Sequence, residues 1–194
     1  QRYDLVQKLK AAMDGGKKEL DVLVDPDERE LIRPLQLLTM KPFVYVANVS
    51  EDQLNSLQGE SLKAVSICAE TEAQLAVMPE NEQNEYLASL GVSTSGLDLL
   101  IKKAYETLGL ISFLTTGELE SRAWTIERGM LAPQAAGVIH TDFEKKFIKC
   151  DTVSFDDFIS LGGWKKARES GKARSEGKGY EIRDGDVVEF KIGA

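Results

Sequence analysis

Two polar side chains directly follow a short apolar segment of this 194-residue chain. Residues 43–47 are rich in strand-forming side chains, and they lead into Asn48 and, three residues later, Glu51. An amide and a carboxylate can form hydrogen bonds along the edge of a nucleotide base. In open α/β sheets ligands bind at the carboxyl ends of the strands, where we expect these two residues to lie. The pattern predicts a base-recognition loop, and the alternative is a polar loop that only caps the next helix.

The spacing of Asn48 and Glu51 resembles the Asn-Lys-x-Asp motif of P-loop GTPases, with two changes. Val49 stands where that motif has Lys, and Glu51 stands where it has the Asp that accepts two hydrogen bonds from guanine. Because Glu is longer by one methylene group, its carboxylate should not hold guanine in the same register. Adenine, held by Asn48 and backbone groups, is the expected base.

A second apolar segment, residues 64–68, has the composition of a strand buried on both faces, as in parallel sheets. In P-loop NTPases the next strand ends in a Ser-Ala-type loop whose backbone amides contact the base. Ser66 and Ile67 occupy that place here. We therefore expect Asn48, Val49, Glu51, Ser66 and Ile67 to line one side of a nucleotide site.

Apolar periodicity predicts the elements that position these loops. Helices are expected at 3–14 and 27–38 as an antiparallel pair, then at 71–78, at 80–90 and from Ser95 to Gly109. Strands that alternate with helices are typical of an α/β domain. The last helix carries an apolar stripe that we expect to be buried, formed by Leu97, Leu100, Ile101, Ala104 and Leu108.

After Gly109 the pattern becomes that of a compact α+β unit. We predict strands at 113–116, 123–126, 148–154, 180–182 and 187–192, helices at 132–147 and 156–161, a turn at 184–186, and a glycine-rich basic segment at 162–179. His140, the only histidine, falls within the helix predicted at 132–147 and has no partner at a catalytic spacing. We interpret it as a structural residue.

Several segments together resemble the YchF family, also called Obg-like ATPases: 41–51, 95–105, 122–126, 132–144 and 184–187. The resemblance implies a P-loop G domain, a helical coiled-coil insertion and a C-terminal TGS domain with a β-grasp (ubiquitin-like) fold. It assigns residues 1–38 to the end of the insertion, 39–109 to the C-terminal half of the G domain and 110–194 to the TGS domain. It also implies Mg²⁺-dependent hydrolysis of ATP, and more weakly of GTP, and association with the ribosome or ribosomal RNA.

The phosphate-binding motif of that family, Gly-x-x-x-x-Gly-Lys-Ser/Thr, does not occur in the sequence, and neither does Asp-x-x-Gly. The chain begins with Gln, so we expect a piece of a longer protein whose N-terminal half would complete the G domain. We expect no catalytic residue and no metal ligand in this piece, and no ATP or Mg²⁺ bound to it alone.

The net charge of −8 opposes binding to nucleic acid through the charge of the whole chain, and no DNA specificity is expected. A local basic cluster lies among Gly and Ser residues, and it is predicted to be either an RNA or ribosome contact or a solvated surface. Its members are Lys165, Lys166, Arg168, Lys172, Arg174 and Lys178.

Two lone cysteines and the lack of a long apolar run favour a cytoplasmic protein without a membrane contact. A second hypothesis remains open at this point. The chain could be a stand-alone β-grasp interaction module that binds RNA or protein without nucleotide chemistry.

Overall fold

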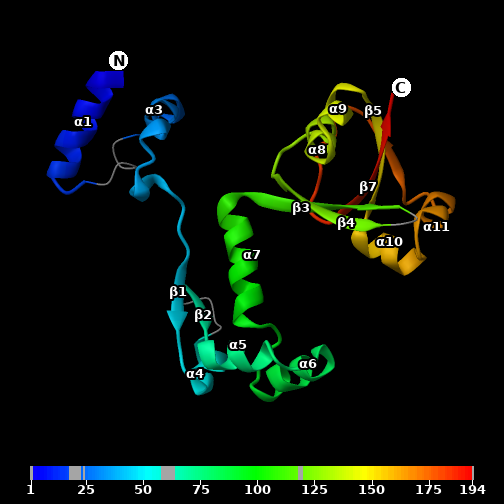
Figure 1. Ribbon diagram of the computed structural model, residues 1–194, viewed down its shortest axis with the longest axis horizontal. Coiled ribbons are helices and arrows are strands. Elements are labelled where there is room, and N and C mark those ends of the chain that lie inside the picture. The colour runs from blue at the N-terminus through cyan, green and yellow to red at the C-terminus, as the bar shows by residue number, and fades with distance from the viewer. Residues whose placement is uncertain (1, 18–22, 24, 58–63, 118–119, 194) are drawn as a thin grey trace.

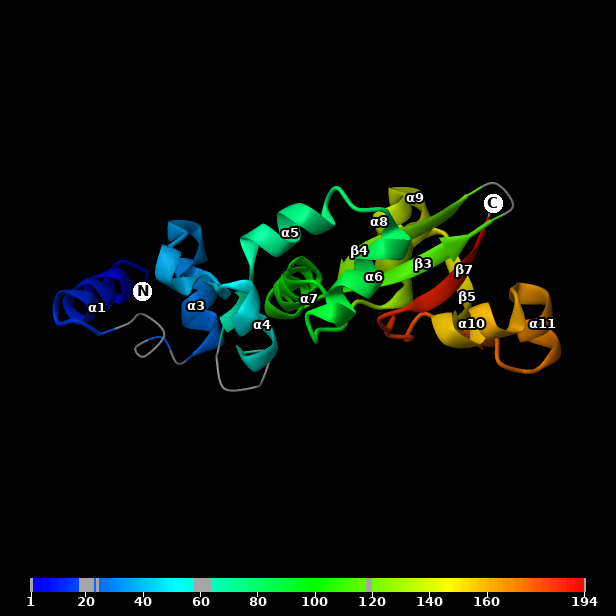
Figure 2. The same ribbon diagram turned by 90° about the horizontal axis from the view of Figure 1, so that it is seen from below.

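The computed structural model describes residues 2–17, 23, 25–57, 64–117 and 120–193. Figure 1 shows N-terminal helices, a small group of strands and helices, a long helix α7, and a C-terminal sheet with its own helices. Figure 2, turned by 90°, shows the same succession along the length of the molecule. No helix in this described part of the chain has both the length and the apolar character that a membrane crossing requires.

The N-terminal helices are α1 (Arg2–Asp14) and α3 (Pro26–Ile32). Asp25 caps α3, because its carboxylate accepts the backbone N–H of Asp27 at 3.0 Å. The two helices share a small core of Leu5, Leu9, Leu23 and Ile32.

The single helix predicted at 27–38 is interrupted. It ends at Ile32 and continues as two 3₁₀ turns, η1 (Arg33–Leu35) and η2 (Leu38–Met40). Pro34 has no N–H to donate, so the backbone hydrogen bonds of the α-helix cannot continue through it. Gln36 then adopts a left-handed conformation with φ of 48°, which an α-helix does not contain.

The small α/β group has two strands in parallel register and a helix after each of them. The elements are β1 (Tyr45–Asn48), α4 (Glu51–Leu57), β2 (Ala64–Ile67), α5 (Ala69–Leu75) and α6 (Glu80–Ser89). The predicted pair of parallel strands is confirmed. Its core consists of Leu54, Cys68, Leu75, Leu87 and Val92.

Helix α7 (Gly96–Leu108) has the ends that its sequence predicts. The Ser95 hydroxyl accepts the N–H of Asp98 at 3.0 Å, and Gly109 ends the helix with φ of 66°. The predicted burial of its apolar stripe is wrong, however, because Leu97, Ile101 and Leu108 are 51%, 48% and 58% exposed. In Figure 1 one long side of α7 has no neighbouring element. The stripe has the spacing of a packed face, but the described residues do not cover it.

The C-terminal sheet has five strands in the order β4-β3-β7-β5-β6. Strands β3 and β7 are parallel, and the other neighbours are antiparallel. The strands are β3 (Leu110–Thr116), β4 (Ser121–Glu127), β5 (Phe147–Ser154), β6 (Arg174–Glu176) and β7 (Asp186–Ile192).

Helices cover both faces of this sheet (Figure 1). They are α8 (Ala132–Ile139) and α9 (Thr141–Lys145) on one face, and α10 (Phe155–Leu161) and α11 (Trp164–Glu169) on the other. Adjacent residues of a strand point to opposite faces. Accordingly Val188 packs with Phe113 beneath α8, and its neighbour Val187 packs with Ala167 of α11.

Three predictions for this unit need correction. The helix predicted at 132–147 is broken at His140, which has extended backbone angles and accepts the N–H of Asp142 at Nδ1, thereby capping α9. The glycine-rich segment contains α11 and β6, which its composition did not indicate. Residues 180–182 form a single bridge, between Leu131 and Glu181, rather than a strand.

The predicted turn at 184–186 is confirmed, with Gly185 at φ of 77°. It joins distant parts of the unit. Asp184 Oδ1 accepts the N–H of Ser112 on β3, and the N–H of Gly185 donates to the Ser112 carbonyl, both at 2.8 Å.

Candidate functional site

The carboxyl ends of β1 and β2 lie side by side. Asn48 and Ile67 are register partners at the last position of each strand, and the N–H of Val49 donates to the Ile67 carbonyl at 2.8 Å. This edge is where open α/β sheets bind their ligands. The structure therefore brings together three residues that the sequence predicts for the base site.

Asn48 joins the two strand ends through its side chain. Its Oδ1 accepts the backbone N–H of Ala69 at 3.2 Å, which fixes the start of α5 against β1. With Oδ1 engaged, the amide NH₂ is the group that Asn48 can offer to a ligand. The side chain is exposed, as such a contact requires.

Glu51 is the first residue of α4, and its two carboxylate oxygens have different surroundings. Oε2 accepts the hydroxyl of Thr71 at 3.3 Å and the hydroxyl of Tyr86 at 2.9 Å. The bond to Glu51, followed by burial, raises the pKa of the Tyr86 hydroxyl, because a nearby carboxylate disfavours a phenolate. Within the described part of the chain, Oε1 carries no hydrogen bond.

Ser66 and Ile67 lie inside β2 and not in a loop after it. Ser66 is 5% exposed, and its Oγ has no hydrogen-bond partner among the described residues. Cys68 and Ala69 follow the strand and occupy the place that the sequence prediction gave to Ser66 and Ile67. The offset arises because the apolar run continues to Cys68, so the sequence pattern did not locate the end of the strand.

Sequence reasoning also missed Thr71 and Tyr86. They lie 20 and 35 residues after Glu51, on α5 and α6, so no local spacing connects them with it. Only the packing of α5 and α6 beside the strand ends brings their hydroxyls to the carboxylate.

Gly96 fixes the start of α7 against this site. Its N–H donates to Glu72 Oε1 at 2.7 Å. A Cβ atom at Gly96 would lie 3.0 Å from Ile67 Cγ1 and 3.1 Å from Ile67 Cα, which is tighter than most packed carbons allow, so Ile67 would have to shift. The close contact between α7 and the end of β2 therefore depends on glycine.

The predicted basic cluster divides into two sets. In one set Arg168 contacts Asp151 and Glu189, Lys172 lies 3.3 Å from Asp157, and Arg174 lies 3.5 Å from Glu176. The other set has no ion pair among the described residues, and it consists of Lys165, Lys166 and Lys178. Since α11 carries Lys165 and Lys166 side by side, they are the cations of the cluster most available to a phosphate.

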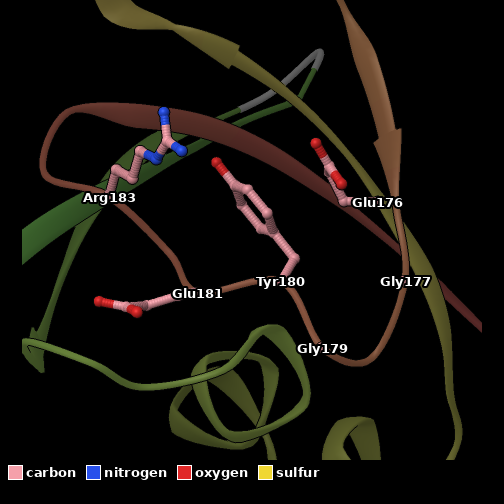
Figure 3. Close-up of a pocket in the computed structure, with 6 residues that line it drawn as sticks. All are labelled: Glu176, Gly177, Gly179, Tyr180, Glu181 and Arg183. Carbon is pink, nitrogen blue, oxygen red and sulfur yellow. The ribbon is translucent and has the colours of Figure 1, made fainter.

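A polar cavity of about 450 Å³ lies in the loop between β6 and β7 (Figure 3). Figure 3 draws the residues that line it: Glu176, Gly177, Gly179, Tyr180, Glu181 and Arg183. Burial and the nearby Asp186 raise the pKa of Tyr180 to about 12. Its hydroxyl donates to Asp186 Oδ2 at 2.7 Å, so this tyrosine ties the loop to the start of β7.

No group of three or more His, Cys, Asp or Glu side chains in the described residues is arranged to hold a metal ion. Both cysteines, Cys68 and Cys150, are buried and free. The strand-end site thus offers an amide and a carboxylate as hydrogen-bonding groups, and among the described residues it contains no group of three or more metal-binding side chains.

The chain is similar to several known proteins. Residues 110–193 match the family model YchF-GTPase_C, described as a protein of unknown function (DUF933). The ribosome-binding ATPase YchF of Bacillus subtilis (strain 168) is 41% identical over 203 residues, which cover 98% of this chain and 56% of that protein. The protein of the same name from Escherichia coli O157:H7 is 44% identical over 186 residues, covering 91% of this chain and 51% of that one.

Two solved structures are similar as well. The Schizosaccharomyces pombe YchF GTPase superposes with a TM-score of 0.73 at 33% identity, over 86% of this chain and 48% of that one. A GTP binding protein from Pyrococcus horikoshii OT3 has a TM-score of 0.53 at 19% identity over the same shares, a likeness of fold alone. The chain spans about half the length of the curated relatives it matches.

Proposed function

Because the chain belongs to the YchF family, we propose that it provides the base-recognition side and the C-terminal interaction domain of a ribosome-associated P-loop hydrolase. The substrate of the whole protein is ATP and, more weakly, GTP. The names of the bacterial relatives, which describe ribosome-binding ATPases, support this assignment.

One observation carries the proposal. Asn48, Val49 and Glu51 stand at the carboxyl end of β1, beside the carboxyl end of the parallel strand β2. Asn48 uses Oδ1 to hold the N–H of Ala69 and keeps its NH₂ group for the base. Val49 and Glu51 replace the Lys and Asp of the guanine-binding motif, which favours adenine.

The phosphates and Mg²⁺ are assigned to sequence outside these 194 residues. The chain has no Gly-x-x-x-x-Gly-Lys-Ser/Thr motif, and its described residues hold no cluster of metal ligands. We therefore assign no catalytic step and no Mg²⁺ ligand to this chain. It should therefore not hydrolyse ATP by itself.

The proposed domains are 1–38 as the end of a helical insertion, 39–109 as the C-terminal half of the G domain and 110–194 as a TGS domain. The exposed stripe of α7 supports the second assignment, since the N-terminal half of the G domain would bury it. Exposed Tyr45 and Val46 on β1 support it too. The third assignment is supported by the central strand β7, which is parallel to β3 and lies beside β5, as we expect for a β-grasp fold.

The experiment uses the full-length protein and measures ATP hydrolysis and the Kd of ATP. Asn48→Ala should weaken ATP binding about tenfold, since it removes a base contact and the tie to Ala69. Asn55→Ala, which changes the same residue type on the far turn of α4, is the matched control and should leave Kd unchanged. Equal ATP affinity in the wild type and Asn48→Ala would contradict the proposed base site.

Ribosomal RNA, or the ribosome as a whole, is the proposed partner of the TGS domain, which places the protein in the cytoplasm. The basic cluster supports this partner through Lys165 and Lys166. Exchange of both lysines for Gln should weaken co-sedimentation with ribosomes and make it less sensitive to salt, because fewer counterions are released. The adjacent pair on α7, Lys102 and Lys103, provides the matched control.

A stand-alone β-grasp module that binds RNA or protein is the second candidate. The C-terminal sheet favours it, because this unit has cores of its own on both faces. The gene sequence upstream of residue 1 distinguishes the two candidate functions. A reading frame that continues upstream into a phosphate-binding motif supports the hydrolase, and a natural start at residue 1 supports the module.

A further inference from the structure

The two carboxylate oxygens of Glu51 differ in their hydrogen-bond partners. Oε2 receives two hydroxyl donors, from Thr71 at 3.3 Å and Tyr86 at 2.9 Å. Oε1 receives none from the described residues, and the Glu51 side chain is exposed. One oxygen is thus held by the protein, and the other is available to a ligand.

The number of available oxygens decides which base edge the carboxylate can satisfy. Guanine presents two adjacent donors, N1–H and the 2-amino group, and needs both oxygens of a carboxylate. Adenine presents one donor, its 6-amino group, beside the acceptor N1. A carboxylate with one available oxygen can accept from the 6-amino group, while its other oxygen is turned away from N1 and its charge is partly neutralised by two hydroxyls.

We infer that Thr71 and Tyr86 are positioning residues that hold one oxygen of Glu51 and thereby set the preference of the site for adenine over guanine. The inference rests on the proposed nucleotide function. It explains how Glu51 discriminates between bases: the hydroxyls reduce a two-oxygen acceptor to a one-oxygen acceptor.

The two hydroxyls are themselves held in place. Thr71 is 1% exposed at the start of α5. Tyr86 precedes Leu87, a residue of the buried core, and Gln83 of the same helix donates to the carbonyls of Leu75 and Met78 at 3.2 and 3.1 Å. Helix α6 is therefore bonded to the end of α5, so neither hydroxyl is carried by a free loop.

Gln74 completes the arrangement. As placed, the Tyr86 hydroxyl faces Gln74 Oε1 at 2.6 Å as well as Glu51 Oε2 at 2.9 Å, and both of these oxygens are acceptors. A hydroxyl has one proton, so both contacts are satisfied when the Gln74 amide turns its NH₂ toward Tyr86. Tyr86 then accepts from Gln74 and donates to Glu51.

Three nucleotides test the inference in the full-length protein. ATP, GTP and ITP are compared by their Kd values, measured calorimetrically without hydrolysis at 4 °C. Hypoxanthine, the base of ITP, has the N1–H donor of guanine but lacks its 2-amino group. With one oxygen available, the wild type should bind GTP no more tightly than ITP.

Tyr86→Phe combined with Thr71→Val should release Oε2 and make the carboxylate a two-oxygen acceptor. GTP should then bind about tenfold more tightly relative to ITP, as expected for one additional hydrogen bond to a charged group. Tyr86→Phe alone should give part of this change. Because the readout is a ratio within one protein sample, a partly unfolded variant changes both affinities alike and leaves the ratio intact.

Tyr105→Phe is the matched control, because it removes a hydroxyl that bonds to Thr125 far from the site. Its GTP-to-ITP ratio should equal that of the wild type. An unchanged ratio in the double variant, or a wild type that already binds GTP tenfold more tightly than ITP, overturns the inference while the nucleotide function stands. A wild type that binds none of the three nucleotides overturns the proposed function itself.

Discussion

At the strand ends, Asn48 and Glu51 have different roles in the proposed site. Asn48 ties β1 to α5 and leaves its NH₂ group available, whereas Glu51 places one carboxylate oxygen against two hydroxyls and leaves the other available. The types of these two residues, and their place after a strand, were readable from the sequence. Thr71 and Tyr86 were not, because their role follows from the packing of α5 and α6.

Restoring the residues of the guanine motif should change the base preference. In the full-length protein, Glu51→Asp combined with Val49→Lys should shift the preference toward GTP by about tenfold, because a shorter side chain leaves the two hydroxyls and presents both oxygens. The ratio of the Kd values of GTP and ATP is the measurement. Glu82→Asp on α6 is a matched control, and an unchanged ratio in the double variant would argue that Glu51 does not read the base.

Cys150 should make the folded chain sensitive to alkaline pH. The thiol is fully buried, and burial together with nearby Glu176 raises its pKa to about 12 from the ordinary 9.0. The folded state favours the protonated thiol, so its contribution to stability is complete below pH 9 and is lost as the pH rises toward 12. Urea midpoints between pH 8 and pH 11 should fall more steeply for the wild type than for Cys150→Ala. Parallel curves would contradict the prediction.

At the scale of elements, the sequence predicted the ends of helix α7 better than the burial of its apolar face. Ser95 and Gly109 mark both ends of α7 in the sequence and in the structure. The break at His140 was missed because histidine is rare as a helix cap, and because the start signal Thr141-x-x-Glu144 lies inside a continuous helical pattern. Helix α11 and strand β6 were missed because glycines surround them, and their stability comes from contacts such as Ala167 with Val153.

The cap of α9 gives a direct test of the corrected helix boundary. His140→Ala should lower the free energy of unfolding by about 1 kcal/mol, because the N–H of Asp142 loses its acceptor. His140→Asn should retain most of the stability, since Asn is a good helix cap. Thermal melts of the three proteins would measure the effect, and equal stability of His140→Ala and the wild type would show that the cap contributes nothing.

At the scale of the whole molecule, the two halves of the chain differ in how fully they bury their apolar surface. The C-terminal sheet is covered on both faces, whereas β1 and α7 keep apolar side chains exposed. Two parallel strands with open faces are not expected to be stable in isolation.

Hydrogen exchange should therefore divide the isolated chain near Gly109. Backbone amides of residues 110–194 should be protected, and those of residues 1–108 should exchange rapidly until the proposed N-terminal half of the G domain is added. Mass spectrometry of peptides from each half measures the difference. Strong and uniform protection throughout the isolated chain would contradict the proposal that residues 39–109 are only the C-terminal half of a G domain.

Gly109 is the whole connection between α7 and β3, since the helix ends at Leu108 and the strand begins at Leu110. Helix α7 is held at its N-terminal end, where the N–H of Gly96 donates to Glu72 beside the proposed base site. Its 13 residues make it roughly 20 Å long, so a tilt of about 10° about this end would carry its far end through about 3 Å. Movement at the strand ends would reach the C-terminal sheet as a larger displacement.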